Sequence, residues 1–481
     1  MKNFLKKTYS NIINVIGTIV VIITSFIIIM WASGYQINFK SGILTETGIL
    51  RINTNIPNSS IYLGNVYEGK TPLIITSLLP GTYKIMIKKQ NYTSWESLVS
   101  VKFKQITNLD AFLFPTTNTE NKLMIPNNTT QIITNINSQN ILITTQDNNG
   151  NEVYYTNPQS QNETPSFLLN LSQISNFNSK NYSIIPNGNF SYILINPNTQ
   201  SNTDYYLYNT SNNSVVDISS EYNIGLFSKI QWINDSVLLL QSNNNNILAT
   251  FNVNDNSINL IYSNNQNINI PYSIYNTNQI IYSIYNVSSN TSSIYTENLD
   301  GSNKTQIYRT NFNIDNIYTS NNSNYIVLRS KTNSILLNTQ TMKPINLGQN
   351  INNIEFSPDN LYILIQKNNQ LWVYYIQNNS QSILIDNLSI ISNITWYPLG
   401  GYIFFDSKEN INSSTNNFIL WSQAISSNTK IKVAENINEN YFITSNGQTL
   451  IINQNASSNS NYINIYSIDL IKQTSIFPFS L

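Results

Sequence analysis

The sequence predicts an all-β protein that begins with one transmembrane helix and continues as a small β-sandwich and a β-propeller. The main observation is a repeat: a short apolar strand recurs eight times after about residue 138, at spacings of 37 to 52 residues. A second strand, most often rich in Tyr or Trp, follows each first strand after 9 to 16 residues. A period near 40 residues that is built from strands alone is typical of propeller blades. Two further regions, residues 12–32 and 42–115, differ from this repeat in hydropathy and composition.

Composition excludes several classes of function. The 481 residues carry 24 basic and 24 acidic side chains, so no net charge attracts nucleic acid, and we expect no nucleic-acid partner. Cysteine and histidine are both absent. A disulfide framework, a thiolate metal site and a Ser-His-Asp triad are therefore impossible. We predict no catalytic residue, no cofactor and no metal ligand.

Residues 12–32 form the predicted membrane anchor. No charged residue occurs between Lys7 and Lys40, and the 21 residues from Ile12 to Ala32 extend about 31 Å as a helix, enough to cross a bilayer. Lysines at the basic N-terminus, residues 1–11, place this end in the cytoplasm and the bulk of the chain outside it. A cleaved signal peptide that ends near Ala32 is the alternative, although its apolar region is normally shorter.

Residues 42–115 predict the small β-sandwich. From Tyr83 to Lys88 apolar and polar side chains alternate, which indicates a half-buried strand with lysines on its solvent face. This region contains seven basic and four acidic residues. The modest positive excess is compatible with a solvated strand face or with contact to anionic lipid headgroups or wall polymers.

The same region resembles the PEGA domain. The resemblance rests on residues 48–52, on the turn Gly69-Lys70-Thr71-Pro72, on the strand entry Leu79-Pro80-Gly81-Thr82-Tyr83 and on the closing Leu113-Phe114-Pro115. It implies a small β-sandwich of the cell envelope without catalytic residues. Residues 64–71 also fit the letters of a phosphate-binding loop. Such a loop must open a helix, whereas Leu73 to Thr76 are typical of a strand, so we expect β-turns here.

A polar linker over residues 116–130 precedes the propeller, residues 131–481. The first strands of the eight repeats are apolar on both faces, as expected for strands packed between neighbouring blades; they centre on Ile141, Ile193, Leu238, Ile281, Ile326, Ile363, Ile403 and Leu450. The second strands centre on Tyr154, Tyr206, Leu248, Ile294, Ile335, Trp372, Ile419 and Ile463. Eight pairs predict eight blades, and seven remain possible if one pair belongs to a cap or linker.

One segment of the repeat resembles the WD40-like repeat of the TolB type. Ser357-Pro358-Asp359-Asn360 stands where that family has the turn between the first two strands of a blade. Asn360 replaces the usual glycine, and asparagine tolerates positive φ. The resemblance implies a propeller blade.

Candidate catalytic groups are few. A glycosidase needs two placed carboxylates, and the candidates for a propeller channel are Glu355, Asp359, Asp406 and Glu409, with Asp359 better explained as a turn residue. Thirty-one tyrosines offer amphipathic surfaces, most of which we expect to pack between blades. The sequence therefore predicts a non-enzymatic, membrane-anchored envelope protein whose propeller binds a protein or a cell-wall or surface polysaccharide. A carbohydrate-active enzyme, a hydrolase or lyase with channel carboxylates, is the alternative.

Overall fold

The computed structural model describes most of the chain, and it divides into two compact units. The described residues are 2–32, 35–38, 43–115, 120–135, 138–147, 150–159, 163–199, 204–221, 227–242, 247–263, 272–276, 278–408, 418–425, 430–438, 441–455 and 462–470. Unit 1 contains the residues up to Thr117, and unit 2 extends from Asn118 to Leu470. The candidate Glu409 lies outside the described residues.

Unit 1 begins with helix α1, Lys2–Ala32. Its large apolar side chains between Val15 and Ile29 are all at least half exposed. Among the described residues, no helix has both the length and the hydropathy of a membrane span. The predicted transmembrane segment Ile12 to Ala32 is thus helical, and its membrane-spanning role is not confirmed.

Two sheets and a hairpin complete unit 1. The hairpin consists of β1, Tyr35–Asn38, and β2, Ile43–Glu46. The three-stranded sheet has the order β6-β3-β9, with β6 Leu73–Leu78, β3 Gly48–Thr54 and β9 Ile106–Ala111. The four-stranded sheet has the order β5-β4-β7-β8, with β5 Val66–Lys70, β4 Ser60–Leu63, β7 Gly81–Lys88 and β8 Trp95–Val101.

The predicted alternation in β7 is confirmed. Ile85 and Ile87 are fully buried, whereas Lys84 and Lys88 are exposed. Burying alternate side chains on one face of each sheet gives the unit its own apolar core, as expected for two packed sheets.

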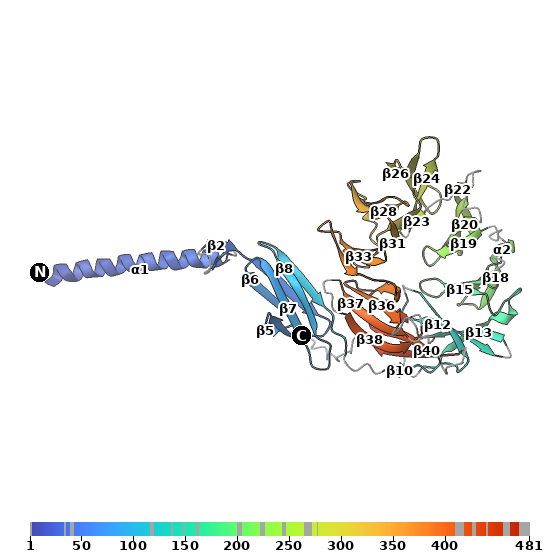
Figure 1. Cartoon of the computed structure of the whole chain (residues 1–481), viewed down its shortest axis with the longest axis horizontal. Helices are drawn as coiled ribbons and strands as arrows, with labels where there is room; N and C mark the ends of the chain where they lie inside the picture. Colours follow the sequence, from blue (N-terminus) through green and yellow to red (C-terminus); the bar gives the residue numbers. More distant parts are fainter. Residues whose placement is uncertain are drawn as a thin grey trace. The chain divides into compact units, whose positions relative to one another are not determined.

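Unit 2 contains eight four-stranded antiparallel sheets among its described residues, arranged around a central axis (Figure 1). Blades 1 to 4 are β11–β14, β15–β18, β19–β22 and β23–β26. Their strands are Thr129–Thr134, Ile141–Asp147, Gly150–Thr156 and Ser166–Asn170; Ser183–Pro186, Tyr192–Asn196, Tyr206–Asn209 and Ser214–Asp217; Phe227–Trp232, Val237–Ser242, Ile247–Asn252 and Ser257–Ser263; Tyr272–Asn276, Gln279–Asn286, Thr291–Asn298 and Thr305–Thr310.

Blades 5 to 7 are β27–β30, β31–β34 and β35–β38, and blade 8 has the order β10-β41-β40-β39. Their strands are Asn316–Thr319, Tyr325–Arg329, Ser334–Asn338 and Pro344–Gly348; Ile351–Phe356, Tyr362–Lys367, Gln370–Tyr375 and Ser380–Ile385; Ile391–Trp396, Tyr402–Lys408, Phe418–Ala424 and Lys430–Ile437; Glu120–Lys122, Ile463–Asp469, Thr449–Asn455 and Tyr441–Ile443. Two single turns, η1 Leu171–Gln173 and α2 Ile218–Glu221, follow outer strands.

The predicted strand pairs are the second and third strands of each blade. Each predicted first strand lies in the second strand of a blade, and each partner lies in the third, with antiparallel pairing throughout. The β-propeller-like fold is confirmed, and with eight sheets it has eight blades rather than seven. The first strand of blade 5 contacts the first strands of blades 4 and 6, which places these strands nearest the axis.

Apolar clusters join neighbouring blades. Among the described residues, seven clusters connect successive blades from blade 8 through blade 1 to blade 7. Between blades 7 and 8 the hydroxyl of Tyr397 donates a hydrogen bond to the carbonyl of Gly447, at 2.9 Å. Each blade is therefore held on both sides, which explains why its second strand is apolar on both faces.

Strand β10 differs from the prediction for residues 116–130. This segment was expected to be a polar linker, yet Glu120, Asn121 and Lys122 pair with Ile468, Ser467 and Tyr466 of β41. Blade 8 thus combines three strands from the end of the repeat with one strand that precedes the first blade. Pairing strands from opposite ends of the repeat closes the ring.

Candidate functional site

The first candidate site lies where the inner strands of blades 6 to 8 approach one another. In β35 the pairing with β36 passes from Ser392↔Asp406 to Thr395↔Phe404, so one extra residue forms a bulge. The bulge brings the Ser392 hydroxyl to 2.5 Å and the Asn393 amide to 2.8 Å from the Asp406 carboxylate, and both donate to it. Asp406 is fully buried. Its carboxylate is therefore a structural acceptor that fixes the bulge.

Tyr441 of blade 8 completes this cluster. Its hydroxyl donates to the carbonyl of Asn393 in blade 7. Burial raises the pKa of Tyr441, the hydrogen bond with Thr395 opposes this, and the negative charges of Asp406 and Glu355 raise the pKa further. Because both charges act on the same phenol, the inner strands bring these two carboxylates close to one side chain.

Glu355 is the carboxylate of this cluster that solvent reaches. Its side chain is exposed, but it projects from β31 among the inner strands and is densely surrounded by protein. The resulting loss of hydration raises the pKa of Glu355 from its ordinary value of 4.5 to about 7. Glu355 therefore exchanges a proton near neutral pH, whereas Asp406 is held away from any ligand.

Of the four candidate carboxylates, Glu355 and Asp406 both lie near Tyr441. Asp359 lies in the turn between β31 and β32, where its carboxylate accepts from the Ser357 hydroxyl at 2.5 Å and from the Leu361 amide at 3.0 Å. Asn360 has a φ of 59°, as the turn requires. The prediction that Asp359 is a turn residue is confirmed. Tyr441 was missed, because no local pattern marks a contact made across two blades.

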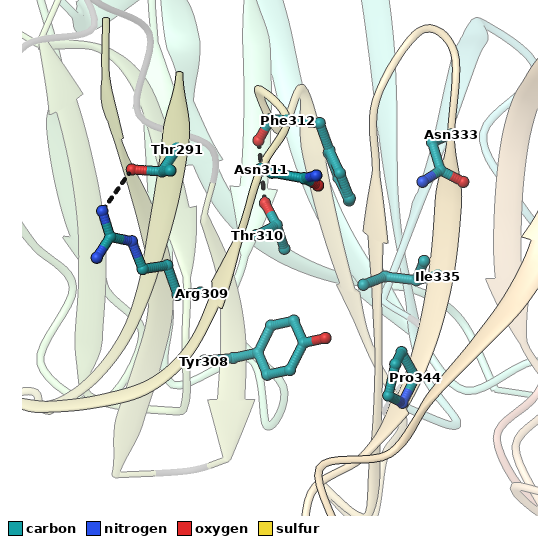
Figure 2. A pocket seen from close by; sticks show the side chains of 9 residues that line it. All are labelled: Thr291, Tyr308, Arg309, Thr310, Asn311, Phe312, Asn333, Ile335 and Pro344. Atoms are coloured by element: carbon teal, nitrogen blue, oxygen red, sulfur yellow. Dashed lines mark hydrogen bonds between the residues drawn. The ribbon is translucent and has the colours of Figure 1, made fainter. Parts of the chain in front are cut away.

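The second candidate site is a groove of about 500 Å³ between blades 4 and 5. Figure 2 shows Tyr308 and Phe312 pointing from blade 4 toward Ile335 and Pro344 of blade 5. Arg309 points the other way and donates a hydrogen bond to the Thr291 hydroxyl, at 3.1 Å (Figure 2). We call this groove the blade 4/5 groove.

Polar groups also line the blade 4/5 groove. The side chains of Asn311 and Asn333 add two amides, and the Thr310 hydroxyl donates to the Phe312 carbonyl at 3.0 Å. None of the nine lining residues is acidic. Aromatic rings beside amides are suited to stacking on a sugar or a peptide side chain while hydrogen bonds fix its orientation. The groove therefore offers binding groups, and its lining holds no side chain that serves readily as a general base.

The other motifs have structural roles. Thr71, in the segment that fits a phosphate-binding loop, is buried, and its hydroxyl accepts from the amide of Ser59 at 3.1 Å. Strand β6 follows it in place of a helix, which confirms the expected turn. Tyr208, Tyr282, Tyr374 and Tyr397 are buried between or within blades, so the predicted packing role holds for these four.

Comparison with known proteins identifies one domain of the chain. Residues 47–117 match the PEGA domain family, which confirms the predicted resemblance over nearly the same range. No curated protein matches the chain.

Several solved structures are similar to the chain at low identity. An oligogalacturonate lyase in complex with manganese has 9% identity and a TM-score of 0.40, covering 70% of this chain and 98% of its own. Dipeptidyl peptidase 4 of Porphyromonas gingivalis has 11% identity and a TM-score of 0.46, covering 67% and 56%. A eukaryotic initiation factor has 12% identity and a TM-score of 0.47, covering 78% and 91%. At these values the similarities carry no argument about activity.

Proposed function

We propose that the chain carrying this PEGA domain is a non-enzymatic, membrane-anchored binding protein that acts outside the cytoplasm. Its propeller recognises a protein or a glycan of the cell envelope. The observation that carries the proposal is the blade 4/5 groove, whose lining combines aromatic rings and amides without an acidic side chain. The groove volume of about 500 Å³ is in the range of ligand sites.

The membrane anchor in this proposal is helix α1. The large apolar side chains from Val15 to Ile29 are all at least half exposed. Such exposure is unfavourable in water and is relieved in an apolar environment. The lysines at positions 2, 6 and 7 favour a cytoplasmic N-terminus. PEGA domains are typical of extracellular and periplasmic proteins, which agrees with this orientation.

The alternative is a carbohydrate-active enzyme that uses Glu355 and Asp406. Its support is the proximity of both carboxylates to Tyr441. Retaining and inverting glycosidases need both carboxyl groups at the substrate, however, and Asp406 is fully buried beneath two hydrogen-bond donors. The geometry therefore favours binding.

The test is capture from solubilised envelopes by the full-length protein, compared with a Tyr308→Ala variant. Captured material is divided between mass spectrometry of proteins and analysis of glycans. We expect one saturable partner that the wild type retains and the variant loses. A partner that both proteins retain equally contradicts a role for the groove, and a polymer that the wild type shortens contradicts a non-enzymatic function.

The anchor needs its own test by fractionation. The full-length protein is expected in the membrane fraction after a carbonate wash, and a chain of residues 36–481 in the supernatant. A full-length protein that the wash releases contradicts the anchor and leaves the groove untouched.

A further inference from the structure

The turn between β8 and β9 presents a phenylalanine to solvent between two lysines. Every residue from Lys102 to Ile106 is exposed, with Phe103 at 60% and Ile106 at 63%. A phenylalanine that is 60% exposed beside two lysines leaves apolar surface in water. The turn thus combines a hydrophobic group with two positive charges at one point of unit 1.

The backbone holds this turn in place. The amide of Lys104 donates to the carbonyl of Thr47 and that of Ile49 to the carbonyl of Gln105, both at 3.0 Å. Gly48 lies against the turn so closely that a Cβ there would be 2.3 Å from the carbonyl oxygen of Lys102. The exposure of Phe103 is therefore built into the fold, because the hydrogen bonds and the close approach fix the backbone that carries it.

The hydrogen bond between Lys104 and Thr47 places the turn beside the segment that follows helix α1. Thr47 directly follows Glu46, the last residue of β2, and Glu46 pairs with Tyr35. Tyr35 is three residues beyond Ala32, where α1 ends. Even a fully extended chain of three residues spans only about 10 Å, so Tyr35 lies within about 10 Å of the end of the helix. The Lys102–Ile106 turn accordingly lies near the C-terminal end of the helix.

We propose that the Lys102–Ile106 turn is a contact site for an anionic lipid surface at the outer end of α1. Phe103 enters the boundary between headgroups and acyl chains, and Lys102 and Lys104 lie among anionic headgroups. This inference rests on the proposed membrane anchor. The PEGA domain then has a defined orientation on the bilayer, since one fixed turn and the end of one helix both contact it.

The absence of cysteine allows a direct test by single-site labelling. A nitroxide spin label is attached at Phe103→Cys in the full-length protein, which is reconstituted into nanodiscs of phosphatidylglycerol and phosphatidylcholine or of phosphatidylcholine alone. The matched control carries the label at Gln90→Cys, an exposed residue beyond the opposite end of β8, about 20 Å along the strand. Collision with oxygen reports lipid exposure, and collision with a soluble nickel chelate reports water exposure.

We expect the label at position 103 to be more accessible to oxygen than to nickel in the anionic nanodiscs, and less so in phosphatidylcholine alone. The label at position 90 is expected to be accessible to nickel in both. Adding Lys102→Gln should shift the label at 103 toward nickel.

Two results would overturn the inference while the anchor stands: a nickel-accessible label at 103 in protein that is incorporated into nanodiscs, or dipolar broadening at 103 from a second copy. A full-length protein that fails to incorporate overturns the anchor, and with it the position of the turn.

Discussion

Tyr397 and Gly447 are in contact across the joint between blades 7 and 8, and the contact leaves no space for a side chain at position 447. The Tyr397 hydroxyl donates to the Gly447 carbonyl at 2.9 Å, and a Cβ on Gly447 would lie 2.5 Å from the tyrosine oxygen. Gly447 also has a φ of +70°. Together with the hydrogen bond from Tyr441 to Asn393, this contact joins blades 7 and 8.

We predict that Gly447→Ala lowers the free energy of unfolding by about 2–3 kcal/mol, the sum of backbone strain and displacement of Tyr397. Gly401→Ala is the control, because Gly401 has a similar φ of +73° but nothing within 4 Å of its Cβ position. It should cost only about 1 kcal/mol. Equal losses in urea denaturation of the two variants would contradict a specific role for the contact.

A second prediction concerns strand β10, which closes the ring of blades by pairing with β41. Leu123, just after β10, is 5% exposed and packs with Ile451 and Ile465 of blade 8. Leu123→Ala should cost about 2–4 kcal/mol and raise hydrogen exchange in β41, because it weakens the strand that closes the ring. Met124→Ala, at a side chain that is 58% exposed, should change stability by less than about 0.5 kcal/mol. Unchanged exchange in β41 would show that closure does not depend on this strand.

The apolar second strand of each blade was predictable from sequence, and most inner and outer strands were not. Strand β20 is buried at Leu238, Leu239 and Leu240, so its letters alone indicate a strand between two layers. Outer strands such as β34 have mostly exposed side chains, which resemble a loop in composition. Strand β10 has three polar residues, and it becomes a strand only because β41 supplies a partner more than 300 residues away.

The candidate sites differ in the same way. Glu355 and Asp406 were named as candidate carboxylates of a propeller channel, but their environments depend on contacts between blades that no local pattern encodes. Asn393 meets Asp406 through a bulge, and Tyr441 reaches Asn393 from the next blade. The blade 4/5 groove has no motif either, because its lining comes from the third and outer strands of two blades and the turns beside them.

Glu355 makes stability depend on pH. Its pKa is raised from 4.5 to about 7 in the folded protein, so the folded state disfavours the charged form. Stability from this group is complete below about pH 4.5 and is lost as pH rises through 7. Glu355→Gln should therefore be more stable than the wild type at pH 8, and the difference should vanish below pH 4.5. Denaturation midpoints between pH 4 and 8 measure this, with Glu163→Gln, at an exposed loop residue, as the control. A wild-type profile that matches Glu355→Gln would contradict the raised pKa.

Asp406 should behave as a structural residue. Asp406→Ala removes the acceptor of the Ser392 hydroxyl and leaves a cavity at a fully buried position, so we expect a loss of about 2–3 kcal/mol. Asp406→Asn keeps one acceptor oxygen and should cost less. Asp386→Ala, at an exposed carboxylate, should be nearly neutral. Calorimetric melting of the three variants tests this order of stability loss. An Asp386→Ala variant that loses as much stability as Asp406→Ala would contradict it.

The central claim is that the propeller binds through the blade 4/5 groove without turnover. The most direct measurement is calorimetric titration of the full-length protein with the captured partner, accompanied by an assay for products. The account predicts saturable binding that weakens at least tenfold in Tyr308→Ala and in Asn333→Ala, remains unchanged in Tyr462→Ala, and yields no product. Equal affinity in all four proteins, or a product whose formation requires Glu355, would contradict it.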